Sequence, residues 1–228
     1  MKLIKLCNKE LFEQGAKILV DKIAELEKQK EFITFGLVGG RSVAGIYEEL
    51  AKKDLHAWKK THFFLIDERN VPIDDIESNY KLVREHLLNP LLHRDQICEE
   101  NIHPINTSLK PELAIHTYQR ELEQYNNFLD IAILSSGEDN HIGAIFPNKK
   151  YPEKEQFAYF NDSPKPPKER FTATPELLSK TSTAIVIFLG ESKKDALKHF
   201  LDNNIEKTLP EITLQKIREL IILTNQVI

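Results

Sequence analysis

The stretch FITFGLVGGRSVAGIYEELAKK, residues 32–53, carries the clearest fold signal in the chain. Its first part, FITFGLV, is a β-rich apolar run, which predicts a buried strand. Gly39 and Gly40 end that run, and the segment from Ser42 onward has apolar residues at helical spacing, with Ser42 as a suitable N-cap. A strand that leads directly into a helix is the repeating unit of α/β folds with parallel sheets.

The same order of strand and helix recurs along the chain. Further apolar runs that predict strands cover residues 61–66, 101–105, 128–134, 183–190 and 219–224. Segments with helical spacing of apolar residues cover residues 9–30, 78–88, 111–127 and 191–204. This alternation predicts a mostly parallel, doubly wound sheet of the α/β class. The proline-rich segment 161–171 predicts a surface loop rather than a linker, so residues 1–228 are expected to form a single domain.

The composition excludes several classes of protein. The 228 residues have a formal net charge of −4 with both signs mixed along the chain, so we expect no binding to nucleic acid. No stretch approaches the ~20 apolar residues of a membrane helix, and the apolar run at the start is too short for a signal peptide. Cys7 and Cys98 lie far apart without metal-ligand spacing, which is typical of a reducing compartment. We therefore expect a soluble, cytoplasmic protein that does not bind membranes.

Polar or glycine-rich motifs follow several of the predicted strands. The motifs are VGGRS at 38–42, DER at 67–69, SSGEDNH at 135–141 and GESKK at 190–194. In an open parallel sheet, ligands bind beyond the carboxyl ends of the strands. Each motif alone is at least as typical of a surface turn, but together they are expected to lie around one crevice.

The first and last of these motifs have the features of a phosphate site. Gly39 and Gly40 let the backbone approach a ligand closely, and the amides at the start of the following helix present the positive end of its dipole to an anion. Arg41 and Ser42 add side-chain donors. Lys193 lies in the first turn of a later helix, where a lysine opposes the helix dipole unless an anion offsets it. Because the chain has no Walker or dinucleotide motif, the predicted ligand is the phosphate of a small metabolite.

These motifs resemble, in order, those of the 6-phosphogluconolactonase family, within the glucosamine-6-phosphate isomerase/6-phosphogluconolactonase superfamily. The matching segments are GLVGGRSVAGIYEEL, HFFLIDERNVPIDDIESNYKLVREHLL, SSGEDNHIGAIFP, PPKERFTATPELL and GESKKDALKHFL, between about residues 36 and 201. The resemblance implies a Rossmann-like three-layer αβα sandwich. It also implies hydrolysis of a small sugar-phosphate lactone, 6-phosphoglucono-δ-lactone, to 6-phosphogluconate in the oxidative pentose phosphate pathway, without a metal ion or cofactor.

Two parts of the chain depart from the family pattern. The phosphate loop of the family resembles S-G-G-S-T-P, and this chain has Val38, Arg41, Ser42 and Val43 in that frame, which keeps the glycines and one hydroxyl. Asn140 replaces the glycine that usually precedes the histidine of the third motif. Because asparagine adopts positive φ more readily than most residues, we expect Asn140 to preserve that turn.

Hydrolysis of a lactone needs a base that activates water. A histidine side chain, whose ordinary pKa is ~6.5, is suited to take a proton from water at cellular pH. His141 is therefore the predicted general base. Asp139, Glu138 or Asp67 could accept a hydrogen bond from its other ring nitrogen, and Asp67 is preferred because its loop is expected at the neighbouring strand end.

Two arginines complete the predicted site. Arg69 is expected to polarise the lactone carbonyl or to bind the product carboxylate, and the alternative for this side chain is an ion pair with a nearby acid. Arg170, from the proline-rich segment, is expected to join the phosphate site.

Other functions remain open at this point. A glucosamine-6-phosphate deaminase would share the fold, but its histidine loop continues into a pattern like F-N-E-P, and AIFPNKK at 144–150 has no such glutamate. A non-catalytic sugar-phosphate-sensing module would leave His141 without a role. A nucleotide-binding regulatory domain would need a fingerprint that the sequence lacks. For the oligomeric state we expect a monomer or a weak homodimer.

Overall fold

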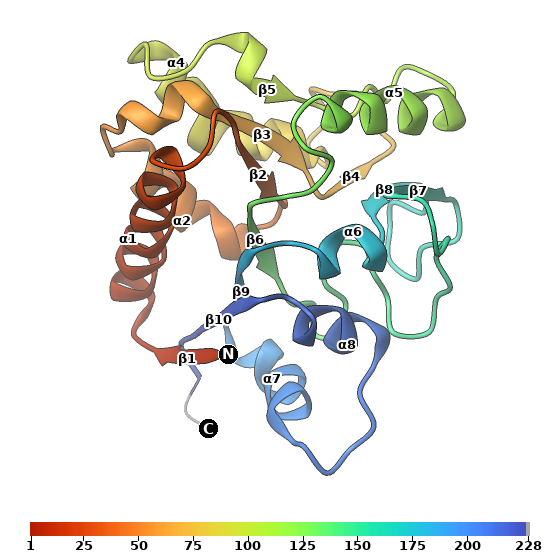
Figure 1. Cartoon of the computed structure of the whole chain (residues 1–228). Coiled ribbons are helices and arrows are strands. Elements are labelled where there is room, and N and C mark those ends of the chain that lie inside the picture. Colours follow the sequence, from red (N-terminus) through yellow and green to blue (C-terminus); the bar gives the residue numbers. More distant parts are fainter. Residues whose placement is uncertain (227–228) are drawn as a thin grey trace.

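A seven-stranded sheet forms the centre of the computed structural model, which describes residues 1–226. Across the sheet the strands are β1 (Lys2–Lys5), β10 (Glu219–Thr224), β9 (Thr183–Phe188), β6 (Ile131–Ser135), β2 (Ile33–Leu37), β3 (Thr61–Leu65) and β5 (Ile102–His103). Each neighbouring pair is parallel (Figure 1). The predicted α/β class with a doubly wound parallel sheet is therefore confirmed.

After β1, which lies at one edge, the chain builds the rest of this sheet outward from its centre in two directions. From β2 it proceeds to β3 and β5 at one edge, and it then returns to β6 on the other side of β2 and continues to β9 and β10. The strand order therefore reverses between β2 and β6, where Phe35 lies opposite Ile131. In sheets of this kind the ligand crevice forms beyond the carboxyl ends of the strands at the reversal point.

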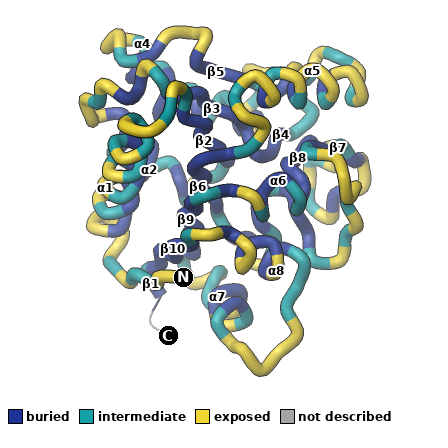
Figure 2. The backbone as a smooth tube through the Cα atoms, in the orientation of Figure 1, coloured by how far each residue is buried: buried dark blue, intermediate teal, exposed yellow. Residues whose placement is uncertain are grey.

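The strands are apolar because both faces of the sheet are covered. Every residue of β2, β3 and β9 is buried, as expected for parallel strands packed between helices. Figure 2 shows the strands of the sheet mostly dark blue and much of the exposed surface on the helices and loops around them.

Helices cover the two faces in separate groups (Figure 1). On one face, α1 (Asn8–Glu27) packs beside α2 (Arg41–Ala51). The helices on the other face are α5 (Pro111–Glu123), α6 (Pro175–Ser179), α7 (Lys194–Leu201) and α8 (Leu209–Gln215). These layers give the three-layer αβα arrangement. Within residues 1–226, none of the helices has the length and apolar character needed to cross a membrane.

The starts of α3 and α2 are formed differently. Ser78 caps α3 (Asn79–Val83), because its hydroxyl accepts a hydrogen bond from the Lys81 amide at 3.2 Å. The prediction that Ser42 caps α2 is wrong: the N-cap residue is Gly40 and the helix begins at Arg41. Gly40 has φ 106°, a conformation that favours glycine, so the turn is set by backbone geometry and not by a side-chain cap.

The helix that begins with α3 is longer and less regular than the predicted segment 78–88. A π-helical turn, η2 (Arg84–Leu88), follows α3, and α4 (Asn89–His93) continues from it. A π-helical segment is usually a single-turn irregularity within an α-helix.

A small second sheet, which the sequence did not predict, lies beside the carboxyl ends of the large one. It is antiparallel with the order β4 (Asp67–Arg69), β8 (Arg170–Ala173) and β7 (Phe157–Phe160). The segment 161–171 was predicted as a surface loop throughout, yet its last two residues begin β8. Because β4 is short and charged and pairs with a strand about a hundred residues later, local sequence patterns do not reveal it.

Candidate active site

A cavity of about 420 Å³ lies beyond the carboxyl ends of β2, β6 and β9, where the strand order reverses. Its walls come from the turn before α2, from β4 and β8, from the loop after β6 and from the turn after β9. The predicted site residues that line it are Gly39, Gly40, Arg41, Ser42, Asp67, Arg69, His141, Arg170 and Lys193. Asp139 reaches the site through its contact with His141. The strand ends thus bring together residues from five distant parts of the chain.

The N-terminus of α2 borders this cavity without a side-chain cap. Its N-cap residue is Gly40, and the first turn contains no acidic residue. The amides of a first helical turn have no partners within the helix, and they carry the positive end of the helix dipole. This end of α2 is therefore available to an anion.

Gly39 is needed because another side chain approaches its backbone closely. A Cβ atom at this position would lie 1.9 Å from Oδ1 of Asn79. Asn79 is buried, and its Nδ2 donates to the backbone oxygen of Asp67 at 2.8 Å and to Oδ2 of Asp67 at 3.0 Å. The glycine therefore makes room for the amide that holds Asp67 in place.

A similar turn follows β9. Gly190 has φ 89° and precedes the 3₁₀ turn η4 (Glu191–Lys193), which leads into α7. Lys193 lines the cavity. Burial lowers the pKa of its ammonium group, the charge of Glu138 opposes that shift, and the charge of Lys165 adds to it. A partly dehydrated cation in such surroundings interacts strongly with an anionic ligand.

His141 is presented by a tight turn at the end of β6. The Gly137 amide donates to the His141 backbone oxygen at 2.7 Å, and the Asn140 amide donates to the Gly137 oxygen at 3.3 Å. Asn140 has φ 65°, which confirms the prediction that asparagine supports this turn at positive φ. A Cβ atom on Gly137 would lie 2.0 Å from Nδ1 of His141, so the turn needs a glycine where the imidazole folds back over it.

The imidazole of His141 is oriented by Asp139. Its Nδ1 hydrogen-bonds to Oδ1 of Asp139, and the Phe146 ring lies 4.9 Å away between ring centroids. Burial acts to raise the pKa of the Asp139 carboxyl, but the hydrogen bond and charge of His141, with the charge of Lys165, hold that pKa well below its usual range. Because Asp139 is ionised, the ring proton belongs on Nδ1, and Nε2 keeps the lone pair that a base needs.

The prediction that Asp67 is the carboxylate that orients the His141 ring is wrong. Asp67 lines the same cavity, but its carboxylate accepts the hydrogen bond from Asn79. Asp139, the neighbour of the histidine in its own turn, takes the position at Nδ1. The difference depends on how the turn folds back on itself, which strand order alone does not reveal.

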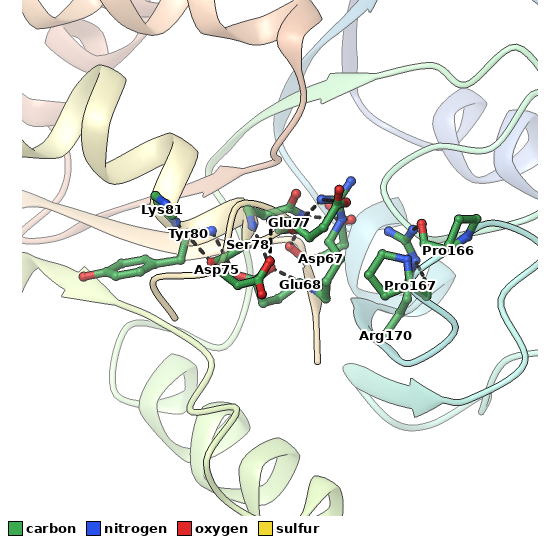
Figure 3. Close-up of polar contacts among 12 residues, drawn as sticks. Asp67, Glu68, Asp75, Glu77, Ser78, Tyr80, Lys81, Pro166, Pro167 and Arg170 are labelled. Carbon is green, nitrogen blue, oxygen red and sulfur yellow. Dashed lines mark hydrogen bonds and ion pairs between the residues drawn. The ribbon is translucent and has the colours of Figure 1, made fainter. Parts of the chain in front are cut away.

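Glu68 fixes the strand that carries two of the site residues (Figure 3). Glu68 is 2% exposed, and its carboxylate accepts hydrogen bonds from the amides of Asn79 at 2.7 Å and Tyr80 at 2.8 Å and from the hydroxyl of Ser78 at 3.1 Å. Burial raises the pKa of Glu68, and the backbone hydrogen bonds oppose that shift. The carboxylate thereby binds β4 to the start of α3, while the strand alternation leaves Asp67 and Arg69 on the cavity side.

Arg69 and Arg170 lie directly opposite each other in the ladder between β4 and β8. Nη1 of Arg69 donates to the Glu77 backbone oxygen at 2.5 Å and lies 3.6 Å from the Glu77 carboxylate. Nη2 of Arg170 donates to the Pro166 oxygen at 2.8 Å (Figure 3). Burial lowers the pKa of Arg170, Asp67 opposes that shift, and Arg69 adds to it. Like charges facing each other across a sheet are unfavourable, so an anion between them would stabilise the pair.

Several cavity residues were not identified from the sequence in these roles. Asn79, Ser136, Glu138 and Ser192 line the cavity, and Lys165 contacts two carboxylates of the histidine turn. The sequence motifs that contain Asn79 and Glu138 were identified, but the contacts of these two residues depend on how the turns fold. Among residues 1–226, no group of three or more histidine, cysteine or carboxylate side chains is arranged to bind a metal ion.

Comparisons with known proteins agree with this geometry. A family model described as glucosamine-6-phosphate isomerases/6-phosphogluconolactonase matches residues 7–222. A 6-phosphogluconolactonase from Borreliella burgdorferi is 32% identical over 204 residues, covering 88% of this chain and 86% of that protein. A human 6-phosphogluconolactonase is 34% identical over 194 residues, covering 79% and 72%.

The fold is also similar to solved structures. The crystal structure of a 6-phosphogluconolactonase from Thermotoga maritima superposes with a TM-score of 0.83 at 28% identity and covers 97% of each chain. A structure from Trypanosoma cruzi has a TM-score of 0.84 at 22% identity, which bears on the fold alone.

Proposed function

Because this chain belongs to the glucosamine-6-phosphate isomerase/6-phosphogluconolactonase family, we propose that it hydrolyses 6-phosphoglucono-δ-lactone to 6-phosphogluconate, a step of the oxidative pentose phosphate pathway. Relatives from Borreliella burgdorferi, Thermotoga maritima and human, which are 32%, 34% and 34% identical and cover most of this chain, carry the name 6-phosphogluconolactonase. A deaminase is disfavoured because AIFPNKK after the histidine turn lacks the glutamate of that branch.

The observation that carries this proposal is the pairing of His141 with an ionised Asp139 at the wall of a cationic cavity. The pair defines a base with its free nitrogen on Nε2. The cavity around it supplies positive charge from Arg41, Arg69, Arg170 and Lys193, which suits a substrate with a phosphate at one end and a carbonyl at the other.

The phosphate is assigned to the end of the cavity bounded by α2 and η4. The amides after Gly39 and Gly40, the Ser42 hydroxyl and the side chains of Arg41 and Lys193 supply donors there. Arg170 adds a further cation from the side of β8. The two helix starts, each preceded by a glycine at positive φ, provide these groups without a side-chain cap that an anion would have to displace.

The reaction then follows from the position of His141. Nε2 takes a proton from water while the water oxygen forms a bond to the lactone carbonyl carbon. Arg69 donates to the carbonyl oxygen as negative charge develops on it. The bond between that carbon and the ring oxygen breaks, and the imidazolium returns its proton to the ring oxygen. Asp139 stabilises the imidazolium between these two transfers, and Asp67 remains in the wall beside it.

The test is a hydrolysis assay with freshly generated 6-phosphogluconolactone, corrected for spontaneous opening. We expect hydrolysis that persists in a chelator, together with no release of ammonia from glucosamine 6-phosphate. Loss of activity in the chelator would contradict a metal-free reaction. Release of ammonia would assign the chain to the deaminase branch.

We further propose that the protein acts in the cytoplasm as a monomer or a weak homodimer. Support comes from two free cysteines, Cys7 and Cys98, both exposed, and from a site to which one copy of the chain supplies the residues named above. Analytical ultracentrifugation tests the oligomeric state, and an obligate dimer at micromolar concentration would contradict it.

A further inference from the structure

Lys165 lies in the loop 161–169, between β7 and β8, and reaches the histidine turn. Its Nζ is 3.3 Å from Oε1 of Glu138 and 3.3 Å from Oδ1 of Asp139. That Oδ1 is the same oxygen that hydrogen-bonds to Nδ1 of His141. One carboxylate oxygen is therefore shared between an ammonium group and the imidazole.

The loop that carries Lys165 is held by its own hydrogen bonds. Ser163 is buried, its amide donates to the Lys168 oxygen at 3.0 Å, and its hydroxyl accepts from the Lys165 amide at 3.3 Å. Arg170 donates to the Pro166 oxygen at 2.8 Å from the following strand. The backbone at Lys165 is thus placed by the fold, and its ammonium group reaches the two carboxylates from a fixed position.

We propose that Lys165 is a positioning residue that sets the basicity of His141 through the carboxylate they share. The ammonium group balances the charge of Asp139, so the imidazole stays neutral, and able to take a proton from water, down to a lower pH than it would beside an unbalanced carboxylate. This inference rests on the proposed role of His141 as the general base.

The direction follows from the charges around the ring. Protonated imidazole gains from a nearby anion and loses from a nearby cation. The charged groups of the histidine turn, of the loop that contacts it and of the cavity that His141 lines are Glu138 and Asp139 of its own turn, Lys165 of the 161–169 loop, Asp67 and Arg69 of β4, Arg170 of β8, Arg41 of α2 and Lys193 of η4. Of these, Lys165 is the cation in contact with the carboxylate that orients the ring, so it acts on the protonation step most directly.

The first experiment follows the titration of the His141 ring by NMR in the free protein, with His141→Asn used to assign the signal among the eight histidines. In Lys165→Gln we expect the titration midpoint to rise by roughly half to one pH unit, since the pair is partly exposed and solvent reduces the effect. Lys165→Arg keeps the charge and should keep the wild-type midpoint. An unchanged midpoint in Lys165→Gln, or an equal rise in Lys165→Arg, would overturn the proposal.

A second variant predicts the opposite shift. Glu138→Gln removes the competing carboxylate and leaves Lys165 on Asp139, so the midpoint should fall, and a rise would contradict the proposal. In the lactone assay, the acid limb of kcat/KM should move in the same direction as each NMR midpoint. Because the titration needs no turnover, a protein that fails to hydrolyse the lactone would refute the proposed function and still test the role of Lys165.

Discussion

Lys193 and Lys194 are neighbours in sequence but lie in different surroundings. Lys193 lines the cavity, and burial lowers the pKa of its ammonium group. Lys194 points to a surface ion pair, with its Nζ 3.0 Å from the Glu191 carboxylate. The two residues therefore form a matched pair for testing the phosphate site.

Replacing Lys193 with alanine should weaken binding of the phosphorylated substrate. A charge-assisted contact is worth ~1.5–3 kcal/mol, so we expect KM for 6-phosphogluconolactone to rise roughly ten- to a hundredfold. KM for unphosphorylated glucono-lactone should hardly change, because that substrate has no phosphate for Lys193 to bind. Steady-state kinetics on both substrates measure this, with Lys194→Ala as the control. Equal effects on the two substrates would show that Lys193 does not bind the phosphate.

A buried histidine away from the site affects the stability of the fold in acid. His62 of β3 is 8% exposed, and its Nδ1 lies 3.0 Å from Nε2 of His103. Its ring stacks on Tyr125 with centroids 3.9 Å apart. Burial, with a smaller contribution from the charge of His103, lowers the pKa of His62 to about 4.

The lowered pKa of His62 determines the direction in which the free energy of unfolding changes with pH. Between pH ~6.5 and about 4 the unfolded chain binds a proton at His62 that the folded protein does not. The stability due to neutral His62 is therefore complete above ~6.5 and is lost as the pH falls toward 4, by on the order of 2 kcal/mol. In His62→Phe, urea unfolding between pH 7 and 4.5 should show a flatter decline than wild type, whereas His93→Gln at an exposed position should not. Parallel declines in wild type and His62→Phe would rule out this contribution.

The turn from Gly137 to His141 determines the orientation of the His141 ring, the proposed base. Its geometry depends on one residue at positive φ, Asn140, and on one position without a side chain, Gly137. The His141 ring and the Asp139 carboxylate occupy the space in which a side chain at position 137 would lie.

Gly137→Ala and Asn140→Gly should therefore behave differently. An added Cβ at 137 would lie 2.0 Å from Nδ1 of His141 and 2.5 Å from Oδ1 of Asp139, so the pair must separate and kcat should fall by roughly tenfold to a thousandfold. Asn140→Gly keeps the turn and should leave kcat within about a factor of two, since glycine adopts positive φ freely. Both are measured as kcat, with fluorescence-detected binding of 6-phosphogluconate as the folding control. Near wild-type kcat in Gly137→Ala would mean that the contact does not matter for turnover.

The small sheet is the element that sequence analysis did not reveal. The strands of the large sheet were found because residues buried on both faces form continuous apolar runs. In contrast, β4 is the charged motif DER, which was interpreted as a strand-end motif, and β8 begins with Arg170 in a segment interpreted as a loop. Their pairing depends on contacts between distant segments, which a local pattern does not contain.

The features of the site that the topology of the sheet alone determines were predictable from the sequence. Motifs at the ends of parallel strands must meet at one edge of the sheet, and the predicted site residues other than Asp139 do line one cavity. The finer contacts were not predictable. Whether Asp67 or Asp139 orients His141, and that Lys165 contacts the same carboxylate, depend on loop conformations that the strand order leaves open.

We propose His141 as the general base for lactone hydrolysis, and the comparison of kcat between His141→Asn and wild type measures this role. Positioned proton transfer contributes roughly 10²–10⁴-fold, so we expect kcat on 6-phosphogluconolactone to fall by that factor in a folded protein. Affinity for 6-phosphogluconate should change far less, because the proposed phosphate donors lie at the α2 and η4 turns. If His141→Asn keeps near wild-type turnover, His141 is not the base, and the carboxylates of Glu138 and Asp139 become the candidates.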